Sequence, residues 1–545
     1  EVYRMFRKND GQKSFFTVEE LLPDALPKND WSFTYRDRVL PMIDENKFAH
    51  LFAVEGGAPN KPVRTTVSIL IFMGLEKLTW RAAEFQFPRR LDWLNATGTA
   101  LGEAKIDFTT LYKFYRRLED DEIARDLFET ITNGFVEFCG TSLKKQRTDS
   151  FFIHGWLKTL SRYGLFKETI RVFLAQLRKA YVDRYEEIAG DLSREYLEKT
   201  FDLTEKDREK AQRRIREMAR DMYSIVEKFE HDKEVNTMEG YKTLETVFKQ
   251  QCKVIEEKEE ETQVEIREKP EGEKIISTPH NTDAEYVRKG KQKVTGSKGF
   301  ISETCDEENK TQFITDVSVT EATKADVKEL PEIHDRTKQA ELKPETQFGD
   351  AGFVNGRTIL DSEETGIVLE GPSSGRSQSL EGFEKEDRPL DAADFEVRID
   401  EESKELQVEG CPQGEAPVDQ ERSEKTGKVN VHFDATRCAD CPECARCPVK
   451  IGITVATFTI DEAGYVGAFR HHQYMSDRDY RKECATRAGV EGTVNEIANA
   501  HGMRSARHRQ NSRIKLQMTF AAIACNVKRF IRHGDKYVYL VPQKA

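Results

Sequence analysis

Two short extended stretches, each carrying an aspartate, restrict how this chain can fold more than any other feature. RTDSFFIHGW, residues 147–156, has Asp149 ahead of an apolar run, and QFGDAGFVNG, residues 347–356, has Asp350 after one. Both stretches are typical of strands, whereas long segments elsewhere have apolar residues at helical spacing. Strands set among helices form a sheet covered by helices, so the sequence predicts an α/β fold.

The region from residue 30 to residue 147 is predicted to be all helical. The stretches TTVSILIFMGLEKLTWRAAEFQF and FTTLYKFYRRLEDDEIARDLFETITNGFVEFCG both have apolar residues at helical spacing. Short helices joined by tight turns fit a helix-turn-helix-like module, in which Arg116 and Arg117 would face DNA. An ordinary helical bundle has the same periodicity and remains an alternative. The run of residues 66–75 is about half the ~20 residues that a membrane span needs.

The middle of the chain alternates between charged helices and short strands. Residues 157–268 are predicted to be charged helices, and TQFITDVSVT at residues 311–320 is predicted to be a strand. Residues 361–434 are rich in Gly, Ser, Glu and Asp, and they predict loops or inserted hairpins. ITVATFTIDEAGYVGAF, residues 453–469, is interpreted as two strands, with helix from about Asp477 onward.

Four of the ten cysteines lie within ten residues, in CADCPECARC. Tandem CxxC pairs bring thiolates together around a tetrahedral Zn²⁺, so Cys438, Cys441, Cys444 and Cys447 are candidate zinc ligands. A reduced, proline-containing loop without metal is the alternative, because the two pairs have no long spacer between them. An iron–sulfur cluster is less favoured, since no redox motif accompanies the cysteines. The scattered remainder does not resemble the disulfide framework of a secreted domain.

The charge of the chain is unevenly distributed. The net charge is −12, but residues 470–545 hold 15 Lys and Arg against 6 Asp and Glu. The acidic residues gather in the middle, in runs such as EEKEEETQVEIREKPEGE. A basic segment on an acidic protein favours a nucleic-acid partner, although a solvated helix face would have the same composition. No export signal is visible, which favours a cytoplasmic location.

Three carboxylates stand out by their positions. Asp149 and Asp350 border extended runs, and Glu491 begins a helix whose continuation is basic. Two strand acids and one helix acid, brought together by the fold, would hold a pair of Mg²⁺ ions, and such a pair catalyses phosphodiester displacement. The alternatives are a helix cap for Asp149, a turn cap for Asp350 and an exposed helix carboxylate for Glu491. Asp316 also lies in a strand context and ranks below Asp350.

At these residues the chain resembles the DDE transposases of bacterial insertion sequences. The resemblance covers TDSFFIHG around Asp149, FGDAGFVNG around Asp350 and RAGVEGTVNEIANAHGMRSARHRQ around Glu491, in the order of that family. It also covers the N-terminal helical region and the position of the cysteine cluster, from about residue 30 to residue 535. The resemblance implies a ribonuclease-H-like mixed sheet core with helical insertions, preceded by an all-α domain.

The resemblance also implies how the chain is divided. The expected parts are a tail (1–29), a helical DNA-binding domain (30–147), the first part of the core with its charged insertion (148–360), an acidic loop-rich insertion with the cysteine cluster (361–455), the last part of the core with a basic helix (456–535), and a second tail (536–545).

Relatives surround the last acid with Tyr, Arg and Lys at fixed spacing. Here Arg487 matches, Cys484 stands in place of Tyr, and Ala498 stands in place of Lys. Arginines bind phosphate oxygens in a bidentate way, so later basic residues are the expected DNA ligands. These are Arg504, Arg507, Arg509 and Lys515.

The resemblance implies Mg²⁺ or Mn²⁺ held by Asp149, Asp350 and Glu491, cutting at the element's ends and then strand transfer. The implied partners are duplex DNA with terminal inverted repeats, target DNA and a second copy of the chain on the paired ends. A catalytically inactive DNA-binding derivative and a general metal-dependent nuclease are the alternatives.

Overall fold

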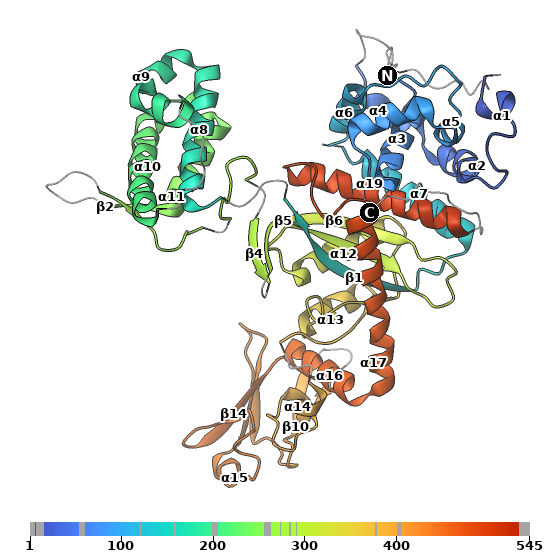
Figure 1. Cartoon of the computed structure of the whole chain (residues 1–545). Helices are drawn as coiled ribbons and strands as arrows, with labels where there is room; N and C mark the ends of the chain where they lie inside the picture. Colours follow the sequence, from blue (N-terminus) through green and yellow to red (C-terminus); the bar gives the residue numbers. More distant parts are fainter. Residues whose placement is uncertain are drawn as a thin grey trace.

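A six-stranded mixed sheet lies at the centre of the computed structural model (Figure 1). Its strands run in the order β6, β5, β1, β7, β8, with β4 pairing with the N-terminal end of β5. Strand β5 is antiparallel to its neighbours β1, β4 and β6, whereas β1, β7 and β8 are parallel to one another. This order and these directions are those of a ribonuclease-H-like core. The strands are β1 (Lys145–His154), β4 (Glu285–Lys289), β5 (Gln292–Thr304), β6 (Ile314–Glu321), β7 (Thr346–Phe348) and β8 (Val368–Glu370).

The structure describes most of the chain. The described residues are 6, 16–53, 60–119, 121–155, 160–198, 205, 207–255, 263–272, 274–282, 285–289, 292–375, 379–400 and 405–533. Within these ranges, no helix is both long enough and apolar enough to cross a membrane. Of the two predicted tails, residues 536–545 lie outside the described residues. The described part of residues 1–29 contains one short helix, Val18–Leu21.

The region before the sheet is helical. Its helices are α1 (Val18–Leu21), α2 (Trp31–Thr34), α3 (Val63–Leu75), α4 (Trp80–Gln86), α5 (Leu91–Thr97), α6 (Phe108–Arg117) and α7 (Ile123–Cys139), with short 3₁₀ or π segments at Tyr35–Val39, Leu40–Met42, Glu45–Leu51 and Phe87–Arg89. The apolar run in residues 66–75 lies inside α3, in which 11 of 13 residues are buried. A helix that is apolar on all sides belongs at the centre of a bundle.

The last helix of the chain joins the helical region to the sheet. Helix α19 (Asn511–His533) packs against α3, α7 and β6, and all four contribute to one hydrophobic core. At the α3 contact, a Cβ atom on Gly74 would lie 3.1 Å from that of Ala524, so a larger residue would separate the two helices. The opposite face of the sheet is covered by α12 (Asp326–Gln339) and α13 (Gly356–Glu364). The core therefore has helices on both faces of the sheet.

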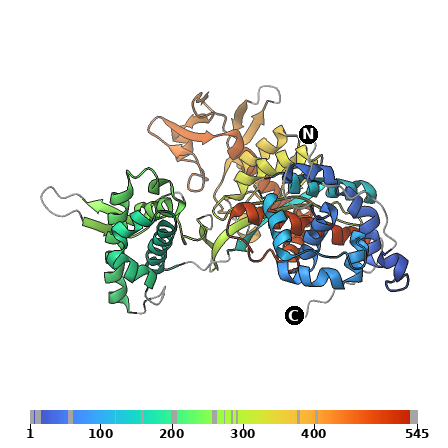
Figure 2. The same ribbon diagram turned by 90° about the horizontal axis from the view of Figure 1, so that it is seen from above.

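Two further bodies are inserted into the core, one between β1 and β4 and one after β8, and Figures 1 and 2 show them as separate lobes. The first has its own apolar core and lies between β1 and β4. It comprises α8 (Arg162–Ala180), α9 (Val182–Ser193), the π segment Arg194–Glu198, α10 (Arg208–Phe229), the 3₁₀ turn Val235–Thr237, α11 (Glu239–Gln251), and the hairpin β2 (Cys252–Ile255) and β3 (Gln263–Ile266).

The second inserted body follows β8 and is mainly strands around another apolar core. It comprises α14 (Leu380–Phe383), the 3₁₀ turn Ala392–Asp394, β9 (Glu396–Ile399), β10 (Leu406–Gly410), β11 (Asp419–Arg422), β12 (Val429–Asp434), α15 (Ala435–Ala439), β13 (Lys450–Ile451) and β14 (Val455–Ile460). Strand β8 belongs to the core sheet, although it falls within residues 361–455, which the sequence predicts to be the loop-rich insertion.

One predicted strand is a helix. After β14, the chain forms α16 (Glu462–Ser476), where the sequence was interpreted as a strand through residue 469. Asp461 caps this helix by accepting from the amide of Gly464, and α16 packs closely on α13. The chain then continues through α17 (Arg478–Cys484), the 3₁₀ segment Ala485–Gly489, α18 (Val490–Asn495) and the π segment Glu496–Ala500.

Candidate functional site

Asp149, midway along β1, and Asp350, just after β7, lie close to each other where the parallel pairing of the two strands ends. In the β1–β7 ladder, Arg147 pairs with Phe348, and each aspartate comes two residues later. Because side chains alternate with a period of two, the aspartates continue the same register on the same face. The predicted pair of strand acids is therefore brought together by the sheet, although 200 residues separate them in sequence.

The environment of Asp149 favours its neutral form. Burial, followed by the negative charges of Asp350 and Asp326, raises the pKa of Asp149 to about 6. The Ser150 amide donates to Asp149 Oδ1 at 2.7 Å, and the positive charge of Arg487 acts in the opposite direction. Burial and like charge outweigh these two contributions. The Ser150 amide and Arg487 therefore do not fully offset the free-energy cost of a negative charge on Asp149.

Asp350 is held at the start of a tight turn. Its Oδ1 accepts from the amide of Gly352 at 2.8 Å, which is the turn-capping bond considered for it. A Cβ atom at position 352 would lie 2.8 Å from Asp326 Oδ2 and 2.9 Å from Asp350 Oδ1. Glycine therefore leaves room for two carboxylates to approach this turn.

Asp326 is an acid near the site that sequence reasoning missed. It is the first residue of α12, and its Oδ1 lies 3.1 Å from Nζ of Lys298. No strand pattern marks it, because it follows β6 through a short turn. A signal could have been found in its place at a helix start directly after a strand, where acids commonly occur.

Arg487 and Glu491 lie on the helical segment that crosses β1. Helix α18 contacts both β1 and β5, and Thr493 of α18 donates to the buried carboxylate of Glu303. Arg487 is close enough to Asp149 to lower its pKa, and Glu491 follows about one helical turn later with an exposed side chain. The segment thus brings Arg487 to the two strand acids and places Glu491 on the same part of the chain.

The two departures from the expected Tyr and Lys positions are both buried. Cys484 and Ala498 are both enclosed within the protein, so neither offers a phosphate ligand at the surface. Tyr480, one turn before Cys484, donates its hydroxyl to the carboxylate of Glu370 at the end of β8. Arg470 pairs with the same carboxylate.

The predicted DNA ligands on α6 lie beside the start of α19. Glu119 pairs with Arg116 at 3.0 Å and with Arg513 at 2.7 Å, so it joins the two helices. Arg116 is exposed, and the guanidinium of Arg117 lies 5.4 Å from the ring centre of Phe52. The structure therefore brings the basic residues of α6 and α19 to one junction.

The loop before α19 and the first turns of α19 carry the other predicted ligands. Arg504 and Arg509 are exposed, and Lys515 is exposed with a 3.8 Å ion pair to Glu122. The loop is fixed to the sheet, because the amide of His154 donates to the carbonyl of Arg504 at 3.0 Å. These three cations are placed where a DNA backbone could reach them.

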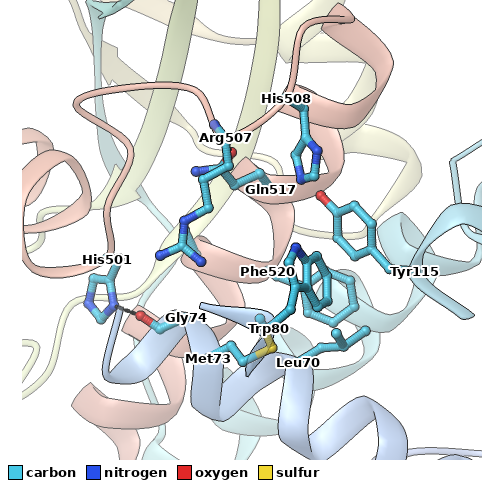
Figure 3. Close-up of a pocket in the computed structure, with 11 residues that line it drawn as sticks. Leu70, Met73, Gly74, Trp80, Tyr115, His501, Arg507, His508, Gln517 and Phe520 are labelled. Carbon is cyan, nitrogen blue, oxygen red and sulfur yellow. Dashed lines mark hydrogen bonds between the residues drawn. The ribbon is translucent and has the colours of Figure 1, made fainter. Parts of the chain in front are cut away.

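Arg507 differs from its neighbours because it points into the protein. It lines a cavity of about 40 Å³ between α3, α6 and α19, together with Tyr115 and His508 (Figure 3). Its Nη1 donates to the carbonyl of Leu78 at 2.6 Å, and burial lowers its pKa. This position favours a packing role for Arg507 over phosphate binding.

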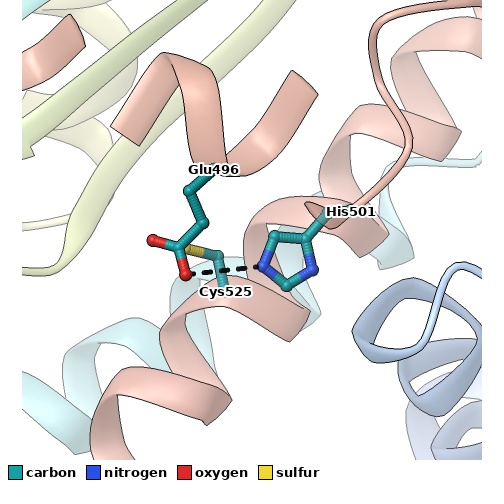
Figure 4. A group of neighbouring side chains, drawn as sticks. All are labelled: Glu496, His501 and Cys525. Atoms are coloured by element: carbon teal, nitrogen blue, oxygen red, sulfur yellow. Dashed lines mark ion pairs between the residues drawn. The ribbon is translucent and has the colours of Figure 1, made fainter. Parts of the chain in front are cut away.

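In the described part of the chain, two groups of side chains have possible metal-ligand atoms. Within each group these atoms lie within 4.8 Å of one another. The two groups are Glu496, His501 and Cys525, shown in Figure 4, and Asp391, Asp394 and His472. The carboxylate of Glu496 already pairs with Lys528 at 2.7 Å and Arg529 at 3.2 Å. Asp394 pairs with Arg388. Cations that already neutralise these acids disfavour a metal at either group.

A hard divalent cation fits the acids around Asp149 better. Their donors are carboxylate oxygens, which Mg²⁺ and Mn²⁺ prefer, and burial together with repulsion from the neighbouring acids raises the pKa of Asp149. A bound cation would relieve that repulsion. Asp149 and Asp350 would hold it, with Glu491 as the expected third ligand.

The four clustered cysteines gather around one cavity, and a fifth joins them. Cys411, at the end of β10, lines the same cavity as Cys438, Cys441, Cys444 and Cys447. Sequence reasoning left Cys411 among the scattered cysteines because 27 residues separate it from Cys438.

Two family profiles match the chain. The profile described as "Transposase DDE domain" matches residues 410–531, which include Cys411 and Glu491. The profile described as "Transposase domain (DUF772)" matches residues 22–117, which cover α2 to α6. Comparison with curated proteins and with solved structures gave no match.

Proposed function

We propose that this chain, two segments of which match transposase family profiles, cuts and rejoins DNA at the ends of a bacterial insertion sequence. The observation that carries this proposal is the register of β1 and β7, which aligns Asp149 with Asp350. Within a ribonuclease-H-like sheet, two neighbouring acids at this position are suited to a metal-dependent phosphodiester site.

Asp149, Asp350 and Glu491 are the proposed metal ligands. Two bound Mg²⁺ or Mn²⁺ ions would activate the attacking oxygen and stabilise the leaving oxygen of an in-line displacement. In the first step, water adds to the phosphorus and the bond to the 3′ oxygen breaks, which leaves a 3′-hydroxyl and a 5′-phosphate. In the second step, that hydroxyl adds to a phosphorus of the target and displaces its 3′ oxygen. No covalent bond to the protein is formed.

Basic side chains of the chain would position the DNA. Arg487 is near Asp149 and is suited to a phosphate next to the scissile bond. Arg504, Arg509 and Lys515, with Arg116 and Arg117 of α6, would contact the backbone further away, because exposed cations bind phosphates without reading sequence. We assign double-stranded DNA with terminal inverted repeats and target DNA as partners, in the cytoplasm, with two copies of the chain on paired ends.

Two alternative functions differ in whether the protein cuts DNA and in whether it recognises the repeats. A catalytically inactive derivative would bind the repeats without cutting them. A general nuclease would cut without preference for the repeats. The unpaired state of Asp149 favours a working metal site over the inactive derivative, since a site that has lost its metal has no need for adjacent uncompensated acids.

The test is cleavage of labelled duplexes that carry the repeats flanking the gene, with and without Mg²⁺ or Mn²⁺. We expect metal-dependent nicking at the repeat boundary by the full chain and none by Asp350→Ala. Binding without cutting by both proteins would support the inactive derivative. Cutting at any sequence would support the general nuclease.

A further inference from the structure

Five cysteines from two separate parts of the second inserted body surround one small cavity. Cys411 ends the β9–β10 hairpin, and the other four follow β12 through α15. The cavity has a volume of about 30 Å³ and is closed on one side by Phe433 and Val449. Cys411, Cys438 and Cys447 also pack against the apolar core of this body. The five cysteines at the cavity are Cys411, Cys438, Cys441, Cys444 and Cys447.

The backbone around two of these cysteines is arranged to stabilise thiolates. In the turn Cys411-Pro412-Gln413-Gly414, the amide of Gln413 donates to Cys411 Sγ at 3.4 Å. The amide of Gly414 donates to the Cys411 carbonyl at 2.8 Å, and Gly414 has a φ of +79°, which glycine adopts readily. In Cys447-Pro448-Val449, the amide of Val449 bonds to the Cys447 sulfur. Amide donors to sulfur are the outer-shell contacts that metal-bound thiolates need.

The sulfurs are near enough to influence one another. After burial, the neighbours that raise the pKa of Cys438 to about 11 are, in decreasing order, Cys447, Cys411, Cys441 and Cys444. Around Cys447 the contributing thiols are, in decreasing order, Cys441, Cys411 and Cys444. Cys411, Cys438 and Cys447 pack against the apolar core of this body, and Cys411, Cys438 and Cys441 line an adjoining cavity, whereas Cys444 does neither. The sulfurs are not gathered as tightly as the ligand atoms of the two groups described above, so side-chain rotation is needed to close them on one ion.

We propose that Cys411, Cys438, Cys441 and Cys447 bind one structural Zn²⁺, with Cys444 outside the ligand set. Four thiolates suit tetrahedral Zn²⁺, and a long spacer between Cys411 and the other three replaces the contiguous cluster predicted from sequence. This site is independent of the proposed DNA cleavage. In the proposed ligand set, Cys411 takes the place of Cys444, which was among the ligands predicted from the sequence.

The proposed ion would join two sheets. Cys411 follows the two-stranded sheet of β9 and β10, whereas Cys438 follows the four-stranded sheet of β11 to β14. A zinc ion bound by both would fix their orientation in a small body with few buried residues of its own. Metal binding would then contribute directly to the folding of this body.

The experiment measures the zinc content of the reduced full-length chain and of Cys411→Ser and Cys444→Ser, purified and then reconstituted with Zn²⁺ alone. We expect one zinc per chain in the unchanged protein and in Cys444→Ser. For Cys411→Ser we expect a loss of affinity larger than the roughly 10–100-fold that loss of an outer-shell contact causes. Replacement by Co²⁺ gives an independent count of thiolate ligands from its absorption spectrum.

Alkylation of the unchanged protein keeps the proposal testable if Cys411→Ser fails to fold. With zinc bound, iodoacetamide should modify Cys444 and spare the other four, as read by mass spectrometry. The proposal is wrong if Cys444→Ser loses zinc while Cys411→Ser keeps it. It is also wrong if the reconstituted chain binds no zinc, or if it holds an iron–sulfur chromophore instead.

Discussion

Two aspartates of the central sheet have opposite surroundings. Asp316 on β6 is fully buried, and its carboxylate pairs with Arg125 at 2.6 Å and Arg336 at 2.8 Å, which lower its pKa. Asp149 on β1 instead has Asp350 and Asp326 nearby, and its pKa is raised to about 6. The fold supplies arginines to one buried acid and further acids to the other. The difference separates an acid that stabilises the fold from one that awaits an external cation.

The largest effect should come from removing an acid at the site. Asp149→Asn or Asp350→Asn should lower the rate of metal-dependent DNA cleavage by about 1,000-fold or more, because a metal ligand acts with the whole site as a unit. The measurement is single-turnover cleavage of the repeat duplex. Asp335→Asn is the matched control, since Asp335 is exposed on α12, and it should cut normally. An equal loss of cleavage rate in Asp335→Asn would show that the loss is not specific to the acids of the site.

Removing the paired acid should instead affect folding. Asp316→Asn leaves two arginines without their buried partner, and breaking such a pair lowers the free energy of unfolding by about 3–5 kcal/mol. Urea unfolding followed by circular dichroism measures this change. Glu332→Gln is the control, because Glu332 is exposed and pairs with the same Arg336 at 3.7 Å, so it should change stability by about 1 kcal/mol or less.

The raised pKa of Asp149 gives a stability effect of opposite sign. The folded-state pKa of about 6 exceeds the unfolded value, so folding takes up a proton between about pH 4 and pH 6. The free energy of unfolding therefore falls as the pH rises through this window, and above it the charged Asp149 costs on the order of 3 kcal/mol.

Asp149→Asn should thus raise the melting temperature above pH 6 in the absence of metal, and the gain should vanish near pH 4. Thermal melts of both proteins across this pH range measure the effect. A variant that melts lower than the unchanged chain above pH 6 would show that Asp149 is compensated after all.

The smallest effect concerns DNA affinity. Arg504→Ala with Arg509→Ala should weaken binding to all duplexes alike, and the slope of log affinity against log salt should fall by about 2, since each phosphate contact contributes about 0.9. Fluorescence anisotropy at several salt concentrations measures the slope. Arg507→Ala should instead lower the melting temperature and leave the slope unchanged, because Arg507 bonds to Leu78 inside the protein. An unchanged slope for the double variant would place the DNA elsewhere.

Some of the fold was readable from the sequence for physical reasons. The apolar run of residues 151–153 in β1 and the apolar run inside α3 gave signals that tertiary packing preserved. Helix α16 was misread because its Tyr, Val and Phe residues favour strands, while the cap at Asp461 and the contact with α13 decide for helix. Propensity is a weak signal when packing opposes it.

The site was readable only where its residues border strands. Asp149 and Asp350 have that pattern, but Asp326 starts a helix and Cys411 ends a hairpin, and only the fold brings them near the others. Arg507 shares its segment with Arg504 and Arg509, so sequence could not show that it alone points inward.

The most direct test of the account is calorimetric titration of Mg²⁺ or Mn²⁺ into the full chain without DNA, at a pH well above 6. The account predicts divalent-ion binding by the unchanged chain that is lost in Asp350→Asn and retained in Asp335→Asn. Equal binding by all three proteins would contradict a metal site at Asp149 and Asp350, and with it the proposed chemistry.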